Sequence, residues 1–137
     1  MRARLPPKRV CWYDRAMDRT SLAELTALVT RFRDQRDWSQ FHSLRNLIVS
    51  LNLEAAELLE LTQWKPDHEI ESLSANAPAR NALQDECADV LAYLLLIADR
   101  AGIDLADALR AKMEKNALKY PVKTSFGSSR KYTELDG

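Results

Sequence analysis

Apolar side chains recur at intervals of three and four along most of the chain, a spacing typical of amphipathic helices. Ser21 with Glu24 predicts a capping box at the start of the first helix, and Gly102 predicts the end of the third. The predicted helices cover residues 22–36, 44–63, 79–100 and 105–119. Because no alternating strand pattern stands out, we expect an all-α protein whose four helices form a bundle.

Polar segments divide the chain into three parts. Residues 1–20 are basic, contain two prolines and have no continuous apolar run, which predicts a disordered or extended leader and not a signal peptide. Residues 21–121 hold the predicted helices and form the expected functional domain, with a polar loop at 66–78 that includes a helical turn near Ile70. Residues 122–137 form a polar C-terminal tail, a candidate cover for an active site.

Two pairs of carboxylates lie within apolar helical stripes, where ionised groups are costly. Glu54 and Glu57 stand in the leucine-rich stripe of the second predicted helix, and Glu86 and Asp89 repeat the arrangement in the third. Residues three apart share a helix face, so antiparallel packing of the two helices would bring the four acids together. Such a group needs a compensating positive charge, and all-oxygen ligands favour a hard cation such as Mg²⁺.

The acids also have interpretations other than a metal centre. Each pair taken alone is more often a solvated helix face, and only the conjunction of two pairs favours a metal. A di-iron carboxylate bundle needs Glu-x-x-His motifs, but His42 and His68 lie outside both pairs. The sequence also lacks clustered cysteine and histidine ligands for zinc, and it lacks the glycine-rich loops that cradle phosphates.

Further residues are candidates for substrate contact. Lys112, Asn116 and Tyr120 share one side of the fourth predicted helix and could touch phosphate oxygens, although an exposed amphipathic surface has the same pattern. Trp38 and Trp64 lie where a pocket mouth can form, and indole rings stack on planar bases. Ordinary core packing explains the two tryptophans equally well.

The composition narrows the classes of function. Twenty basic and twenty acidic residues cancel in a chain of 137, so no net field attracts nucleic acid or an anionic membrane. No apolar run reaches membrane-spanning length, and two cysteines without a CxxC pair suggest a reducing compartment, so we expect a cytoplasmic protein. The third predicted helix is apolar nearly all round, which predicts a homo-oligomer, either a dimer or a tetramer.

Several short motifs follow the order found in a known family. They are Arg36-Asp-Trp-Ser-Gln-Phe-His42, Arg45-Asn-Leu47, Glu54-x-x-Glu57, Gln63-Trp-Lys65, Glu86-x-x-Asp89 with Tyr93, Lys112-Met113, Asn116, Tyr120-Pro121 and Lys131-Tyr-Thr-Glu-Leu135. Through these motifs the chain resembles, over residues 21–135, the dCTP pyrophosphatases of the MazG-like superfamily.

The resemblance implies a MazG-like helical catalytic domain over residues 21–121, assembled as a dimer of dimers. It implies a Mg²⁺-dependent enzyme that cleaves dCTP, or a modified dCTP, to the monophosphate and pyrophosphate and so cleans the nucleotide pool. The implied metal-binding and catalytic residues are Glu54, Glu57, Glu86 and Asp89. The expected substrate-binding residues are Trp38, Ser39, Gln40, Phe41, His42, Trp64 and Tyr93, with Lys112 and Asn116 on the phosphates.

Two departures from the family bear on specificity. Val29 stands where better-known members place a substrate-contacting histidine, and Thr62 stands where an aromatic residue commonly precedes the Gln-Trp pair. The base and sugar preference therefore stay open, and a broad-specificity nucleoside triphosphate pyrophosphatase is one alternative. A noncatalytic helical nucleotide-binding scaffold is the other, but a scaffold would gain stability from leucine in place of its buried acids.

Overall fold

The computed structural model describes residues 20–135, and the regular secondary structure of this part is entirely helical. Its elements are α1 (Leu22–Asp34), η1 (Trp38–Phe41), α2 (Leu44–Glu60), α3 (Asp67–Glu71), η2 (Leu73–Ala75), α4 (Ala77–Ala101), α5 (Leu105–Lys119), α6 (Val122–Ser125) and η3 (Tyr132–Glu134). The predicted all-α class is confirmed, whereas all but the last residue of the predicted leader lies outside the described part. Among residues 20–135, no helix has the length and apolar character to cross a bilayer.

Polar side chains fix the starts of the four long helices. In the capping box predicted for α1, the Glu24 N–H donates to Ser21 Oγ at 3.2 Å, and the Ser21 N–H donates to Glu24 Oε2 at 2.6 Å. The side chains of Ser43, Asn76 and Asp104 accept backbone hydrogen bonds at the starts of α2, α4 and α5. Because Asn76 is a strong N-cap and proline is tolerated in a first turn, α4 begins two residues earlier than predicted.

The first two long helices end earlier than their apolar spacing predicts. α1 ends at Asp34 and α2 at Glu60, and each is followed by a residue in the left-handed region, Asp37 at φ 53° and Trp64 at φ 60°. This conformation interrupts the helical ladder for any L-residue. The helix ends are therefore set by backbone turns. The apolar spacing continues past these turns, so it predicts longer helices.

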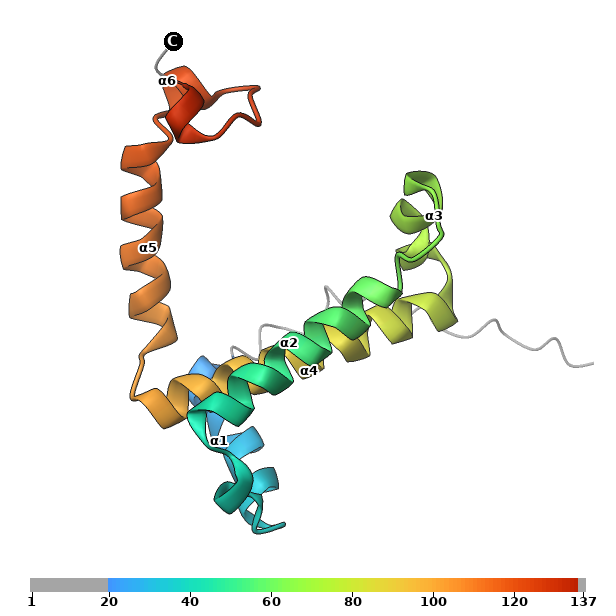
Figure 1. The fold of residues 1–137 in the computed structure, drawn as a ribbon, viewed down its shortest axis with the longest axis vertical. Helices are drawn as coiled ribbons and strands as arrows, with labels where there is room; N and C mark the ends of the chain where they lie inside the picture. The colour runs from blue at the N-terminus through green and yellow to red at the C-terminus, as the bar shows by residue number, and fades with distance from the viewer. Residues whose placement is uncertain (1–19, 136–137) are drawn as a thin grey trace, which may run out of the picture.

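α2 and α4 form the centre of the fold. They run antiparallel and side by side, and α1 packs across the C-terminal half of α4 (Figure 1). The buried side chains are Leu47 on α2 and Leu95, Leu96 and Ala98 on α4, and they lie where the start of α2 meets the end of α4. The apolar stripes of the two acid-bearing helices thus face each other, as the sequence predicts.

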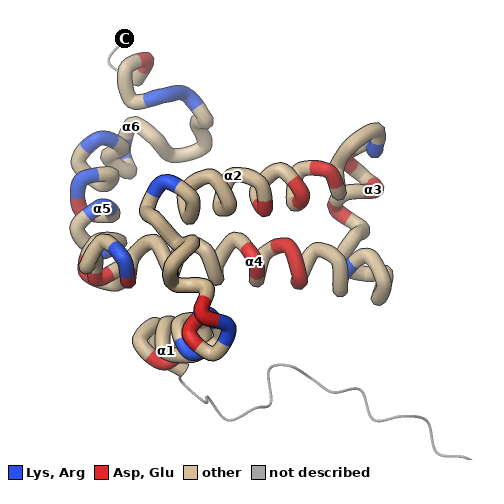
Figure 2. The backbone as a smooth tube through the Cα atoms, turned by 60° about the horizontal axis from the view of Figure 1, so that its bottom comes forward, with Lys and Arg blue, Asp and Glu red and all other residues tan. Residues whose placement is uncertain are grey.

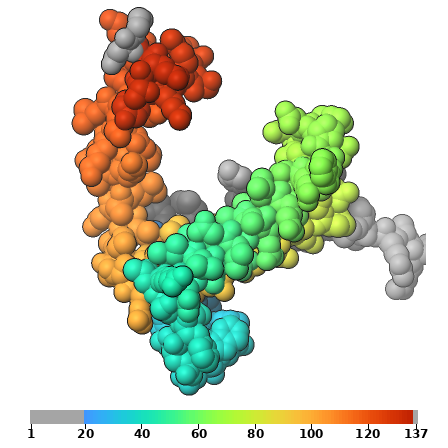
Figure 3. All heavy atoms as spheres, in the orientation of Figure 1, coloured from blue at the N-terminus to red at the C-terminus, as the bar shows by residue number. Residues whose placement is uncertain are grey.

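α5 does not complete the expected bundle within one chain. Gly102 ends α4 in the left-handed conformation, at φ 65°, and α5 then projects away from α2 and α4 (Figures 1 and 3). Three of its apolar side chains stay accessible, Leu109 at 60%, Met113 at 49% and Leu118 at 82%. The prediction of a four-helix bundle is therefore wrong for the single chain, because the connector directs the fourth helix away from the other three.

Leu47 is 1% exposed in the centre of this packing. We expect Leu47→Ala to lower the free energy of unfolding by about 2–5 kcal/mol, because the deletion leaves a cavity between α2 and α4. Leu47→Met conserves volume and should cost less than about 1.5 kcal/mol. Urea unfolding of both variants at equal protein concentration measures the difference, and equal losses for the two would contradict this account of the core.

Candidate functional site

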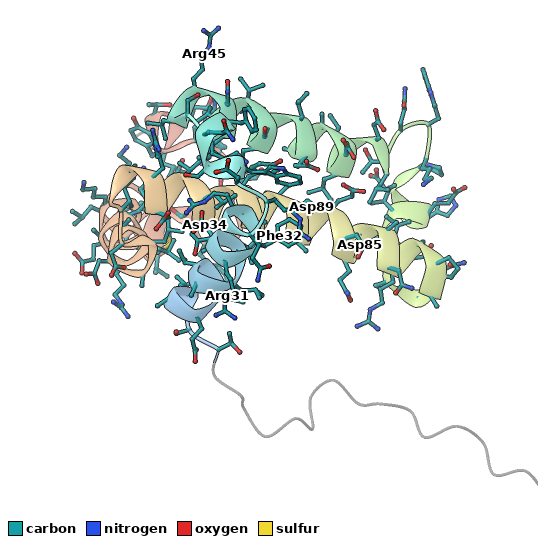
Figure 4. All side chains as sticks on the ribbon, turned by 90° about the horizontal axis from the view of Figure 1, so that it is seen from below. Arg31, Phe32, Asp34, Arg45, Asp85 and Asp89 are labelled. Carbon is teal, nitrogen blue, oxygen red and sulfur yellow. The ribbon has the colours of Figure 1, made fainter. Side chains whose placement is uncertain are left out.

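Three of the four predicted acids meet between α2 and α4. One carboxylate oxygen from each of Glu54, Glu57 and Glu86 lies within 4.8 Å of the other two. The antiparallel pairing of the helices produces this juxtaposition, and Figure 2 shows acidic positions of α2 and α4 facing each other along the pair. Asp89 follows on the side of α4 that faces α2 (Figure 4), and its charge acts on Glu54. We call these four residues the acid cluster.

The environment of the acid cluster disfavours ionised carboxylates. Burial, followed by the charges of Glu57, Asp89 and Glu86, raises the pKa of Glu54 above its ordinary value. Burial also raises the pKa of Glu86, with repulsion from Glu57 and Asp89 adding to it. Both shifts have the direction expected when like charges share a site with restricted solvent.

The acid cluster has the features of a cation site. Oε2 of Glu86 is buried and has no hydrogen-bond partner within residues 20–135. The ion pairs of this part of the chain involve Arg33 and Arg110, and none includes an acid of the cluster. Convergent carboxylate oxygens without a protein cation are the donor set that a hard divalent cation takes. The three converging glutamates therefore fit a divalent metal.

A cavity of about 410 Å³ adjoins the acid cluster through Asp89. Its walls come from α1, from α4, from Trp38 of η1 and from His42, which directly follows η1. The cavity therefore lies beside the helix pair that carries the acids. The lining residues are Leu28, Val29, Phe32, Arg33, Trp38, His42, Asp89, Ala92, Tyr93 and Leu96. We call this space the aromatic cavity. It brings together Trp38, His42 and Tyr93, three of the residues predicted to contact the substrate.

The other η1 residues predicted to contact the substrate, Ser39, Gln40 and Phe41, do not line the aromatic cavity. Gln40 instead folds back on its own turn, where its Nε2 donates to the backbone oxygen of Asp37 at 3.0 Å and to the carboxylate at 2.7 Å. Phe41 is 61% exposed, and Ser39 is also exposed. The assignment of Ser39, Gln40 and Phe41 to substrate contact stays a prediction.

Three further predicted residues lie away from the aromatic cavity. Trp64 is 94% exposed in the turn after α2. Lys112 and Asn116 lie on α5, which projects away from the acid cluster (Figure 1). Within one chain Lys112 and Asn116 do not meet the acids, because the connector after α4 carries α5 outward, and the side chain of Trp64 faces solvent. Their role also stays a prediction.

One wall of the aromatic cavity comes from α1, where the sequence resemblance singles out Val29 alone as a position that bears on substrate contact. The α1 residues of this wall are Leu28, Val29, Phe32 and Arg33, which form one face of the helix. Phe32 meets Trp38 edge to face, with ring centroids 5.9 Å apart, and the guanidinium of Arg36 lies 3.6 Å from the Phe32 ring centre. The spacing at i, i+1, i+4 and i+5 could have marked this face, but the same spacing marks ordinary core packing.

Comparisons with known proteins agree with this geometry. The family model described as MazG-like matches residues 49–135, which include the whole acid cluster. The chain belongs to the MazG-like family. It is 44% identical over 115 residues to dCTP pyrophosphatase 1 of Homo sapiens and of Bos taurus, an overlap of 84% of this chain and 68% of each relative.

A solved structure extends the MazG-like comparison to the fold. The crystal structure of a pyrophosphatase from Archaeoglobus fulgidus has a TM-score of 0.66 with this chain at 43% identity. The match covers 73% of this chain and 92% of the archaeal protein. This chain therefore shares its fold, over 73% of its length, with a pyrophosphatase of known crystal structure.

The raised pKa values predict how stability depends on pH. A carboxyl whose pKa is higher in the folded state binds more protons there, so metal-free stability falls as pH rises from the ordinary glutamate pKa through the raised one. Glu86→Gln removes one repelling charge, and we expect it to raise the unfolding temperature at pH 7 in the presence of EDTA. The gain should shrink toward pH 4, where both states are protonated.

Thermal unfolding across this pH range provides the measurement, with Glu114→Gln on α5 as the control outside the acid cluster. A Glu86→Gln variant that melts below the wild type at pH 7 in EDTA would show that repulsion within the cluster does not limit stability.

Proposed function

We propose that this chain is a Mg²⁺-dependent pyrophosphohydrolase that converts dCTP, or a modified dCTP, to dCMP and pyrophosphate and so cleans the nucleotide pool. The observation that carries the proposal is the position of Asp89, which belongs to the acid cluster and also lines the aromatic cavity. A nucleotide with its base in the cavity would have its phosphates beside the acids. The names of the related proteins support the reaction and the base.

Glu54, Glu57, Glu86 and Asp89 would hold the metal, and Mg²⁺ suits their all-oxygen donor set. Bound there, Mg²⁺ would offset the charge on the triphosphate oxygens. We assign the general base to Glu57, which is exposed to solvent while Glu54 and Glu86 are partly buried, and which, unlike the exposed Asp89, belongs to the three converging glutamates. Its carboxylate would orient a water molecule and accept its proton as the oxygen attacks the α-phosphorus. The bond from that phosphorus to the bridging oxygen breaks, and pyrophosphate leaves.

The base and sugar would occupy the aromatic cavity. Trp38 and Tyr93 offer ring faces and edges to a planar base, and Val29 leaves the α1 wall apolar at that position. This apolar wall favours the second candidate function, a broad-specificity pyrophosphatase, since shape alone discriminates bases weakly. A noncatalytic scaffold is disfavoured because an acid cluster with raised pKa values destabilises a protein that makes no use of it.

The triphosphate also needs cationic partners, which the acid cluster does not contain. Lys112 and Asn116 lie on the α5 helix that projects from its own chain, and the same helix exposes Leu109, Met113 and Leu118. A helix with accessible apolar side chains gains stability when a second copy covers them. We therefore place Lys112 and Asn116 at the acid cluster of a neighbouring subunit in a homo-oligomer, either a dimer or a tetramer. The proposal has three further parts. The protein is cytoplasmic, its catalytic domain spans residues 21–121, and its C-terminal tail at 122–137 covers the active site.

A panel of nucleoside triphosphates with Mg²⁺, with separate detection of pyrophosphate and orthophosphate, tests the reaction. Formation of dCMP and pyrophosphate, with dCTP turned over fastest, supports the proposal. Equal turnover of many triphosphates would replace it with the broad-specificity function, and tight binding without products would replace it with the scaffold.

The acid cluster predicts linked losses of metal binding and turnover. We expect Glu86→Gln to lower kcat/KM for dCTP by at least about 100-fold, because it removes a carboxylate that stabilises the charged transition state through the metal. Mg²⁺ binding, measured by calorimetry, should weaken in parallel. The exposed α3 variant Glu71→Gln serves as the matched control and should keep both properties. A Glu86→Gln enzyme with full Mg²⁺-dependent activity would remove Glu86 from the site.

A shared site predicts complementation between inactive subunits. Glu54→Gln lacks a metal ligand and Lys112→Ala lacks a phosphate contact, so each homo-oligomer should be impaired. Mixed oligomers would contain some sites that combine an intact acid cluster with an intact α5, and we expect activity to reappear after co-refolding. Light scattering establishes the oligomeric state of the same samples. A mixture no more active than the average of its components would show that each site uses a single chain.

A further inference from the structure

Arg33 is a cation fixed in the wall of the aromatic cavity. It projects from α1, its side chain is 15% exposed, and it lines the cavity together with Trp38, His42 and Tyr93. Nε of Arg33 donates to Oδ1 of Asp34 at 2.7 Å, and Nη1 donates to Oδ2 of Asp99 on α4 at 3.3 Å. Two carboxylates from different helices therefore hold the guanidinium in one orientation.

These two contacts also decide what Arg33 can bind. The hydrogen bond to Asp34, with a smaller contribution from Asp99, raises the pKa of Arg33, so the side chain stays protonated. Its charge is balanced locally by the two carboxylates, which makes it a poor partner for a phosphate. A guanidinium has five N–H donors and no acceptor, and the two ion pairs engage only part of this set. The remaining donors suit uncharged acceptors.

His42 provides a second unsatisfied polar group in the same cavity. Its Nδ1 is buried and has no hydrogen-bond partner within residues 20–135. Burial, with the nearby charge of Arg33, lowers the pKa of His42, so the ring is neutral at pH 7. Buried polar groups normally have partners. Two polar groups that retain hydrogen-bonding capacity, among apolar and aromatic walls, mark a place where a ligand supplies the missing hydrogen bonds.

The point at which Arg33 contacts α4 indicates which part of a nucleotide Arg33 would meet. Asp89 is at the acid cluster, and Asp99, which pairs with Arg33, comes ten residues later, or about 15 Å along the helix axis. The phosphates would lie at the Asp89 end of the aromatic cavity. The guanidinium therefore lies toward the end that the base would occupy, on the far side from the acids.

We propose that Arg33 is a specificity residue that selects cytosine by donating hydrogen bonds to the adjacent acceptors N3 and O2. This inference rests on the proposed function, because it takes the aromatic cavity as the base site. Uracil and thymine carry a hydrogen on N3, so they would place a donor against the donors of Arg33. A site that hydrogen-bonds its ligand rejects an analogue with the wrong pattern strongly, since its own groups are left unpaired. The apolar Val29 wall supplies shape, and Arg33 supplies the discrimination.

Substitution of Arg33 by lysine tests this role. Lysine keeps the positive charge for Asp99 but loses the planar fork of donors. We expect Arg33→Lys to lower kcat/KM for dCTP about tenfold or more and to leave kcat/KM for dUTP within about twofold of wild type. Arg31→Lys is the matched control, because Arg31 lies on the same helix and points away from α4 (Figure 4). It should leave both values unchanged.

A substrate analogue isolates the contact from any general disturbance of the cavity. In 3-deaza-dCTP a C–H group replaces N3, so wild type should lose on this analogue about what Arg33→Lys loses on dCTP. The variant itself should discriminate little between dCTP and its deaza analogue. An unchanged preference of Arg33→Lys for dCTP over dUTP, or an equal loss on both substrates, overturns the assignment of Arg33.

The proposed function can fail separately from this inference. A wild type that forms no pyrophosphate from any triphosphate refutes the enzymatic proposal alone. In that case, calorimetric binding of dCMP and dUMP to wild type and Arg33→Lys replaces the kinetic measurement. A cytosine preference that Arg33→Lys abolishes supports the assignment, and a preference that it leaves intact overturns it.

Discussion

Mutual repulsion among carboxylates is the constraint on which the rest of this structure depends. The apolar stripes of α2 and α4 pack antiparallel, and this packing forces Glu54, Glu57 and Glu86 within 4.8 Å of one another. The hydrophobic contact that stabilises the helix pair thus holds together groups that repel each other. A divalent cation would resolve the conflict, so the packing that builds the core also brings together the oxygen donors that such a cation takes.

The site has two chemically different halves joined at Asp89. One half is the acid cluster between α2 and α4, with a buried and unpartnered Glu86 oxygen. The other is the aromatic cavity between α1 and α4, with Arg33 tied to Asp99 in its wall. α4 contributes to both halves, and the spacing of its residues along the helix fixes their separation. The proposed substrate has two matching parts, a charged triphosphate that a metal would stabilise and a neutral base that stacking and oriented donors would hold.

α5 is the long helix that projects away from α2 and α4 of its own subunit. It carries the candidate phosphate contacts and several accessible apolar side chains, yet it leaves the body of its own subunit. The acid cluster has no protein cation within residues 20–135 at ion-pair distance. α5 carries a cationic side chain that the acid cluster lacks, and its apolar side chains lack a covering surface. Under the proposed function, assembly and catalysis would be coupled, since the contact that would cover the α5 apolar face would also deliver its lysine and amide to the phosphates.

The sequence by itself determined the helical class, the capping box at Ser21 and the membership of the acid cluster, because each depends on local spacing or on one helix face. It did not determine where α1 and α2 end, since left-handed residues at Asp37 and Trp64 interrupt the chain without a break in the apolar pattern. Only the tertiary structure decided that α5 stands apart and that Arg33 lies beside Trp38 and His42. Arg33 and its partner Asp99 are 66 residues apart, and contacts over such separations arise from helix packing, which no local pattern records.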